Sequence, residues 1–233
     1  MKIKSLGGFA MSNMEGIVKA RHSVRSFTDQ KIEGEVLTEL QKALDEANAE
    51  SGLQIKLALN EEKAFGEGHY GQFHNCKNYI CIIGDKDLKN LEEVSGYYGE
   101  KIALKAQELG LNTCWVALTY KKSEVPFELK DSEKIVIVIA TGYGVNQGSA
   151  HKMKDFSSVS KTAENESPEW YKKGIEYALH APTAINQQKF VFELKNQNEV
   201  SAKAKLGPCS KIDLGIVKYH FELGAGKENF KWN

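Results

Sequence analysis

Apolar and polar positions repeat along the chain with two different periods. Apolar residues at intervals of three and four predict helices over residues 13–21, 33–50, 100–109, 168–181 and 213–225. Alternating or continuous apolar runs predict strands over residues 53–59, 79–83, 114–118, 135–140 and 190–194. The run at 79–83 is apolar throughout, which is typical of a strand buried on both faces. This mixed order of helices and strands indicates an α+β protein.

One unit of helix, turn and strand occurs twice. Residues 35–57 and 168–192 both pass from a helix through small residues and a glutamine into a strand. Helix–turn–strand units of unrelated origin share this pattern, so coincidence and duplication both remain open. On the second reading, a single domain over 12–233 consists of pseudo-repeat halves at about 12–145 and 146–233. Residues 1–11 are expected to form a flexible lead.

Charge and cysteine content restrict the class of partner. The chain has 31 basic and 31 acidic residues, so no net field attracts nucleic acid or a membrane surface. No apolar run approaches membrane-spanning length. The four cysteines lack the spacing of a zinc site or a redox pair, which favours reduced thiols. We therefore expect a cytoplasmic protein without metal, nucleic-acid or membrane partners.

A basic cluster follows the first predicted helix. Arg21, Ser23 and Arg25 alternate, so an extended backbone would present two guanidinium groups and a hydroxyl on one side. Such a fork suits a phosphate. The alternative is a solvated basic helix end, where cations meet the negative end of the helix dipole.

A second motif occupies residues 181–190. Pro182 ends the preceding helix, and the small Thr183 and Ala184 leave room for a flat ligand close to the backbone. The side chains of Asn186 and Gln188 each offer a donor and an acceptor, which suits the edge of a heteroaromatic ring. An ordinary capped turn is the alternative.

Taken together, these motifs resemble the nitroreductase superfamily of FMN-dependent oxidoreductases from Met14 to Phe230. Residues 21–25 are similar to its R-R/H-S-x-R/K motif, and residues 181–190 to its A-P-S-x-x-N-x-Q-P-W turn, with Thr183, Lys189 and Phe190 as substitutions. Residues 109–115 resemble L-G-L-G-T-C-W, and residues 139–144 resemble an A-x-G-Y strand end. The resemblance implies a central, mainly antiparallel sheet flanked by helices, and FMN as cofactor.

The order of the motifs departs from the ordinary family pattern. In most members the A-P-S turn comes soon after the basic motif and reaches the flavin of the other subunit in a domain-swapped dimer. Here residues 49–54 occupy that place, and the turn comes late. This resembles a divergent thermophile-type subfamily with a duplicated, rearranged half. The late turn can act within its own chain, so a homodimer and a monomer both remain open.

The resemblance assigns cofactor contacts residue by residue. The set expected at the FMN phosphate and ribityl chain is Arg21, His22 and Ser23, with Arg25 near the phosphate or the ring. The set expected to pack on the isoalloxazine is Pro182, Thr183, Ala184, Asn186 and Gln188, with Trp115 and Val116 at its border. Lys152 and Lys154 align with a late phosphate clamp, although a solvated charge cluster explains them equally well. Tyr97, Tyr98 and residues 66–71 are candidates for the substrate face.

The implied reaction is ping-pong. NAD(P)H passes hydride to flavin N5, and a nitroaromatic, quinone or related conjugated acceptor then takes its place, so no side chain acts as a catalytic nucleophile. The chain has no G-x-G-x-x-G after a strand, so the nicotinamide is expected to dock transiently. Two alternatives remain open. One is a flavin-binding protein without turnover, such as a storage, sensor or flavin-destroying relative, and the other is a fold relic without cofactor.

Overall fold

The computed structural model describes the backbone of residues 7–65 and 73–233 and the side chains from Met14 onward. Helix α1 (Gly7–Ala20) begins earlier than the predicted residue 13. Of the flexible lead expected over 1–11, residues 1–6 lie outside the described part, and so do residues 66–71 of the expected substrate-face loop.

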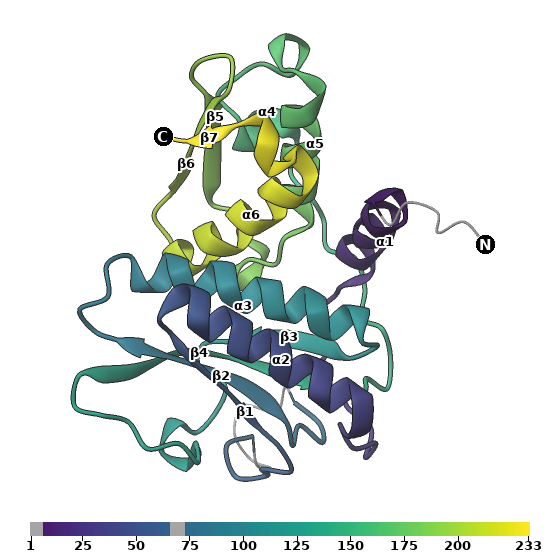
Figure 1. The fold of residues 1–233 in the computed structure, drawn as a ribbon, viewed down its shortest axis with the longest axis vertical. Helices are drawn as coiled ribbons and strands as arrows, with labels where there is room; N and C mark the ends of the chain where they lie inside the picture. The colour runs from purple at the N-terminus through teal and green to yellow at the C-terminus, as the bar shows by residue number, and fades with distance from the viewer. Residues whose placement is uncertain (1–6, 66–72) are drawn as a thin grey trace.

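A four-stranded antiparallel sheet forms the first part of the molecule (Figure 1). Its spatial order is β1 (Gln54–Ala58), β2 (Tyr79–Asp85), β4 (Glu133–Gly142) and β3 (Asn112–Val116). Ile80 and Ile82 of β2 point into one core cluster, and Tyr79, Cys81 and Ile83 point into another. The predicted burial of this strand on both faces is confirmed.

Two helices cover one face of this sheet. Helix α2 (Gly34–Ser51) packs against α3 (Leu91–Glu108), and both contribute to the larger core cluster. Helix α2 ends at Gly52, whose φ of 72° lies in the left-handed region and whose N–H donates to the carbonyl of Asn48. Glycine takes this conformation without steric cost, which explains the break after Ser51.

The second part of the molecule carries its own small sheet (Figure 1). Helix α5 (Glu169–His180) precedes β5 (Phe190–Leu194), which pairs antiparallel with β6 (Glu199–Ala204). Helix α6 (Ser210–Ala225) follows, and β7 (Lys231–Trp232) then pairs parallel with β6. The remaining short elements are α4 (Phe156–Val159), η1 (Lys122–Glu124), η2 (Glu164–Glu166), η3 (Ala184–Asn186) and η4 (Lys227–Asn229).

Helices α3 and α6 join the two parts through an unusually close crossing. A Cβ added at Gly96 would lie 2.0 Å from the carbonyl oxygen of Ile212. One added at Gly215 would lie 1.9 Å from the carbonyl oxygen of Glu93. Each helix therefore places a glycine against the backbone of the other. No helix in the described ranges is long and apolar enough to cross a membrane.

The predicted α+β class with antiparallel strands and flanking helices is confirmed, although the strands divide into two sheets. Both halves follow the order helix, strand, strand, helix, namely α2–β1–β2–α3 and α5–β5–β6–α6. The shared order is the one that a duplication would produce, and the duplication itself remains a proposal. The division at about residue 145 remains a proposal.

Candidate functional site

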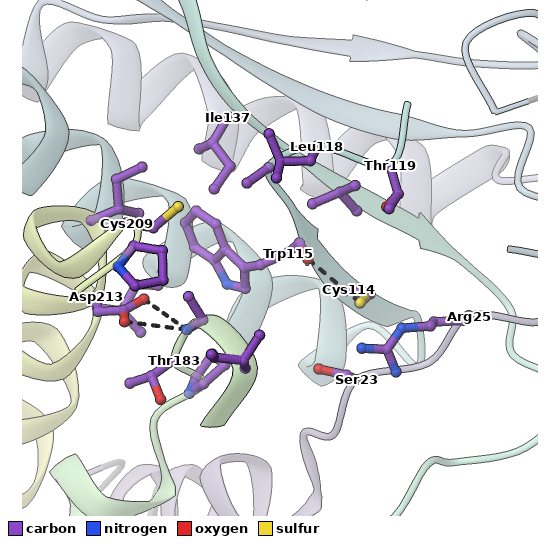
Figure 2. Close-up of a pocket in the computed structure, with 18 of the residues that line it drawn as sticks. Ser23, Arg25, Cys114, Trp115, Leu118, Thr119, Ile137, Thr183, Cys209 and Asp213 are labelled. Carbon is purple, nitrogen blue, oxygen red and sulfur yellow. Dashed lines mark hydrogen bonds between the residues drawn. The ribbon is translucent and has the colours of Figure 1, made fainter. Parts of the chain in front are cut away.

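A pocket of about 300 Å³ opens where sequence-distant segments meet (Figure 2). The predicted site residues in its wall are Ser23, Arg25, Trp115, Val116, Pro182, Thr183 and Ala184. Apolar side chains of β4 and α6 complete much of the lining, including Ile137, Ile212 and Ile216. The fold thus brings the basic motif, strand β3 and the late turn of one chain to a single cavity.

The backbone around Arg25 is held on two sides. The N–H of Val24 donates to the carbonyl of Thr113 at 3.0 Å, and the N–H of His74 donates to the carbonyl of Arg25 at 2.9 Å. These bonds place Ser23 beside the end of β3 and Arg25 beside residues 73–75. Ser23 and Arg25 consequently face the same pocket from a fixed segment.

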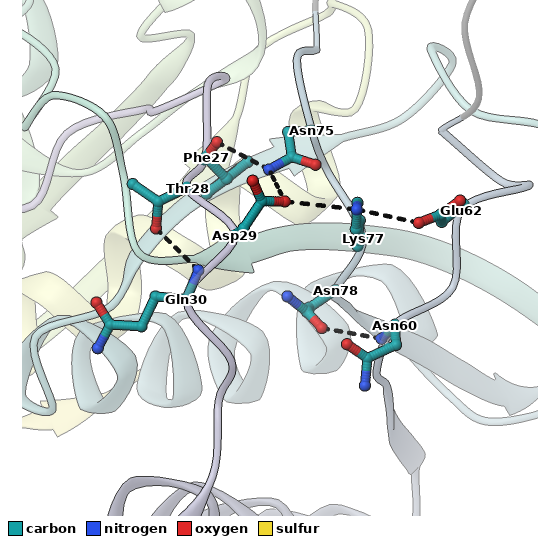
Figure 3. A network of polar contacts seen from close by, with 9 residues as sticks. All are labelled: Phe27, Thr28, Asp29, Gln30, Asn60, Glu62, Asn75, Lys77 and Asn78. Carbon is teal, nitrogen blue, oxygen red and sulfur yellow. Dashed lines mark hydrogen bonds and ion pairs between the residues drawn. The ribbon is translucent and has the colours of Figure 1, made fainter.

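A polar network fixes the continuation of this segment (Figure 3). The amide of Asn75 donates to the carbonyl of Phe27 at 3.2 Å and to the carboxylate of Asp29 at 3.0 Å. The ammonium of Lys77 lies 3.5 Å from Asp29 and 3.1 Å from Glu62. Exposed ion pairs of this kind contribute little to stability. The hydrogen bonds of the Asn75 side-chain amide and those between backbone groups are therefore the stronger restraints on this segment.

Arg21 does not share the pocket with Ser23 and Arg25. Its N–H donates to the carbonyl of Ile17 at 3.0 Å, so it still belongs to the last turn of α1 and not to the extended segment. The prediction that all three side chains point the same way is therefore wrong in geometry. The Arg21 side chain is 2% exposed and lies beside α3.

Glu100 of α3 is the centre of a buried polar cluster. It is fully buried, and its two oxygens accept hydrogen bonds from the Trp115 indole and the His220 ring, each at 2.8 Å. Nε of Arg21 lies 3.5 Å from the same carboxylate. Nε and Nη1 of Arg21 have no hydrogen-bond partner among the described residues. The cluster ties Trp115 in the pocket wall to both α1 and α6.

The late turn has a constrained backbone. Ile185, Asn186 and Gln188 have φ values of 48°, 54° and 44°, in the left-handed region that side chains other than asparagine rarely adopt. The carboxylate of Asp213 accepts from the N–H of Ala184 at 3.0 Å and from the Gln187 amide at 2.7 Å. Asp213 therefore holds the turn against the N-terminal end of α6.

The amides of Asn186 and Gln188 are bonded within the chain. Both donate to the carbonyl of Lys152, at 3.0 and 2.9 Å, and the oxygen of the Gln188 amide accepts from the N–H of Lys154 at 2.9 Å. The Lys154 ammonium donates in turn to the carbonyls of Gln187 and Gln188. Residues 152–154 and the turn thus fasten each other outside the pocket lining. Their contact with a flavin stays a prediction, and these bonds compete with it.

His22 lies beside the site without lining the pocket. Burial, followed by the neighbouring charges of Arg21 and His151, lowers the pKa of His22. The hydroxyl of Tyr97 accepts from Lys227 at 2.8 Å and donates to Glu222 of α6. Neither Tyr97 nor Tyr98 reaches the pocket.

Asp213 is the charged lining residue that sequence reasoning missed. It is 4% exposed, and burial raises its pKa to about 6, against the hydrogen bonds from Gln187 and Ala184. The available signal was an acidic residue in the first turn of an otherwise apolar helix, which alone indicates only a favourable contact with the helix dipole. Its role depends on the tertiary contact with the turn.

The raised pKa predicts a pH-dependent contribution to stability. The folded protein binds the Asp213 proton more tightly than the unfolded chain, so this contribution is present below about pH 4 and is lost as pH rises through about 6. The free energy of unfolding of Asp213→Asn, measured relative to wild type, should therefore rise by on the order of 2 kcal/mol as the pH is raised from 4 to 7. Urea unfolding of both proteins across this range measures the difference. A difference that does not change with pH would contradict the assignment.

Solved structures place this architecture in the nitroreductase fold. A putative nitroreductase of Thermotoga maritima matches with a TM-score of 0.63 at 19% identity, over 96% of this chain and 88% of that one. A putative nitroreductase in complex with FMN from Desulfovibrio desulfuricans matches with a TM-score of 0.51 at 15% identity, over 62% and 93%. A putative NADH dehydrogenase/NAD(P)H nitroreductase from Parabacteroides distasonis gives 0.51 at 17%, over 63% and 96%. The predicted nitroreductase-like fold is confirmed.

A protein-family model described as "Putative TM nitroreductase" matches residues 13–225. The match spans most of the chain, and the chain therefore belongs to this nitroreductase family. The family resemblance inferred from the motifs is confirmed. No curated protein sequence matches the chain significantly.

Proposed function

We propose that the protein is an FMN-dependent oxidoreductase that passes hydride from NAD(P)H to a small conjugated acceptor in a ping-pong cycle. The observation that carries this proposal is the single pocket joining Ser23 and Arg25 to Trp115 and to the turn at 182–184. Family membership and the FMN complex of the Desulfovibrio structure support the cofactor. NAD(P)H and the hydrogen ion supply the two electrons and two protons that convert a nitro group to a nitroso group and water.

The residues present fit a flavin phosphate and ring. Ser23 and Arg25 offer a hydroxyl and a guanidinium to the pocket. Buried Arg21, whose Nε and Nη1 lack hydrogen-bond partners among the described residues, lies beside Glu100 and outside the lining. A hydroxyl and a guanidinium side by side donate charge-assisted hydrogen bonds to a phosphate, so Ser23 and Arg25 favour an anionic group at this end of the pocket. The apolar wall around Trp115 suits a flat ring. When bound, FMN would supply the hydride-accepting and hydride-donating centre.

The chain's own residues would bind and orient that group. Ser23 and Arg25 would hold the polar end, and Pro182, Thr183 and Ala184 would pack against the ring from the opposite wall. A guanidinium close to the ring stabilises negative charge that develops on reduction. Five further residues stay proposed contacts of the phosphate or the ring, although none of them lines the pocket: His22, Lys152, Lys154, Asn186 and Gln188.

One chain supplies both walls of the pocket. The Thermotoga structure matches 96% of this chain, whereas the Desulfovibrio and Parabacteroides structures match 62% and 63% while being almost fully covered themselves. This difference supports the proposed duplication, in which the second half takes the place of a partner's arm. A dimer is then not needed to complete this pocket. We place the protein in the cytoplasm as part of the same proposal, because its four cysteines are free thiols.

The absorbance spectrum of the purified protein tests the proposal. The FMN-loaded protein should show a flavin band that bleaches when NADH or NADPH is added without oxygen and returns when a quinone or nitroaromatic is added. A stable flavin band that neither nucleotide bleaches would favour the flavin-binding protein without turnover. Colourless protein that does not take up added FMN would exclude both.

Removal of the pocket guanidinium should weaken flavin binding. Arg25→Ala deletes a charged hydrogen-bond donor, so we expect the Kd for FMN to rise about 10- to 100-fold, equivalent to about 1.4–2.7 kcal/mol. Fluorescence titration of the apoprotein with FMN measures this change. Lys31→Ala is the matched control, because Lys31 is an exposed cation on the same segment and outside the lining. Equal effects of the two substitutions would contradict a specific contact by Arg25.

A further inference from the structure

The pocket is polarised from one end to the other. Ser23 and Arg25 lie on one side of Trp115, and Asp213 and Cys209 lie on the other (Figure 2). Among the described lining residues, Arg25 is the cation and Asp213 is the carboxylic acid. The wall between them is mainly apolar. A ligand that fills this pocket therefore meets opposite charges at its two ends.

Asp213 is fixed in place and poorly hydrated. It is 4% exposed, and its oxygens accept from the backbone N–H of Ala184 and from the Gln187 amide. It also sits in the first turn of α6, where the positive end of the helix dipole favours a carboxylate. A carboxylate held in this way cannot turn away from a second anion in the pocket.

We propose that Asp213 makes the pocket selective for neutral or cationic conjugated acceptors and disfavours acceptors that carry a carboxylate or another anionic group. This inference rests on the proposed oxidoreductase function. Two like charges repel strongly where water is scarce, so an anionic acceptor loses binding free energy beside Asp213. A neutral aromatic acceptor meets no such repulsion, and one that carries an N–H or O–H group can donate a hydrogen bond to the carboxylate. The turn that would pack against the flavin ring is bonded to Asp213 through Ala184, so an acceptor stacked on that ring would lie beside Asp213.

Protonation of Asp213 should remove this selectivity. The titratable groups that share the pocket are Cys209 on α6, Cys114 on β3 and Arg25, while the adjoining turn contributes the uncharged Ala184 and Gln187. Burial raises the pKa of both Cys209 and Cys114, so the two thiols stay neutral near pH 6. Burial also raises the pKa of Asp213 to about 6. Selectivity should therefore be strong at pH 8 and weak at pH 5.

The test compares 4-nitrobenzamide with 4-nitrobenzoate as acceptors for the FMN-loaded, NADH-reduced protein. The two molecules have similar shapes and differ in charge, and comparing the same pair across variants cancels their intrinsic reactivity. We expect Asp213→Asn to raise the kcat/KM ratio of nitrobenzoate to nitrobenzamide about tenfold at pH 8. Asp85→Asn is the matched control, because Asp85 is an exposed carboxylate outside the lining, and its ratio should equal that of wild type.

The wild-type protein provides a second, independent measurement. Its ratio should rise toward that of Asp213→Asn as the pH falls from 8 to 5, and this arm decides the matter if the variant does not fold. A ratio that is independent of pH in wild type and unchanged in Asp213→Asn would overturn the inference, while flavin reduction by NADH would still support the proposed function. Failure of the reduced protein to form at all would overturn both.

Discussion

Replacement of Glu100 by alanine should lower the free energy of unfolding by about 3–5 kcal/mol. The Glu100 carboxylate is fully buried and is the acidic group beside the side chain of Arg21, which is itself 2% exposed. Its loss leaves the guanidinium in the interior without an opposite charge and removes the acceptor of the Trp115 indole. Urea unfolding monitored by far-UV circular dichroism measures this change in the free energy of unfolding.

Two control variants separate charge from packing. Glu100→Gln keeps the shape and one acceptor oxygen, so we expect an intermediate loss of stability. Glu50→Ala removes a carboxylate that is 51% exposed and 2.8 Å from Lys101, and its effect should stay within about 1 kcal/mol. If Glu100→Ala were no more harmful than Glu50→Ala, Arg21 would have another source of compensation.

The cluster around Glu100 also shows which part of the site the sequence could predict. Local motifs identify segments: the basic motif, the late turn and the strand predicted at 114–118 all exist, although that strand is β3 at Asn112–Val116, and the fold brings the three together. Side-chain direction was less accessible. Alternation places Ser23 and Arg25 correctly, but α1 continues to Ala20 and its last turn rotates Arg21 away.

Arginine usage was a stronger signal than the alternation. Arg21 and Arg25 are the chain's only arginines, and the other basic residues among the 31 are lysines. Arginine offers a planar fork of donors that lysine lacks, so its restriction to this segment indicates a geometric requirement there. Arg21 lies beside the buried carboxylate of Glu100, and Arg25 lines the pocket. Their spacing in the sequence does not reveal which arginine takes which place.

The errors in the helix and strand predictions have identifiable physical causes. The strands at 79–83 and 135–140 are continuous apolar runs, and the structure contains both. Helix α3 was predicted to begin at residue 100, but it begins at Leu91. The prediction missed its first turns because Gly96 and Gly99 lower the helix propensity of that stretch. Strand β6 was missed because its apolar positions are Val200 and two alanines, and alanine is a weak strand former. In both cases tertiary contacts override local preference.

Gly215→Ala should show how far the pocket depends on the close crossing of helices α3 and α6. The new Cβ would lie 1.9 Å from the carbonyl oxygen of Glu93, which is backbone and cannot rotate away. We expect helices α3 and α6 to separate and the free energy of unfolding to fall by about 3 kcal/mol. Because α6 carries Ile212, Asp213 and Ile216 into the pocket, flavin affinity should fall as well. Urea unfolding and FMN titration measure the two effects.

The same substitution at an open glycine should have the opposite sign. A Cβ at Gly16 in α1 meets nothing within 4 Å, so Gly16→Ala should gain about 0.5–1 kcal/mol from helix propensity alone. Gly96 faces Gly215 across the same crossing, with its Cβ 2.0 Å from the carbonyl oxygen of Ile212. Once one alanine has separated the helices, a second costs less, so Gly96→Ala with Gly215→Ala should destabilise by less than the sum of the single changes. Strict additivity would mean that each helix adjusts locally, and the pocket would then keep its shape.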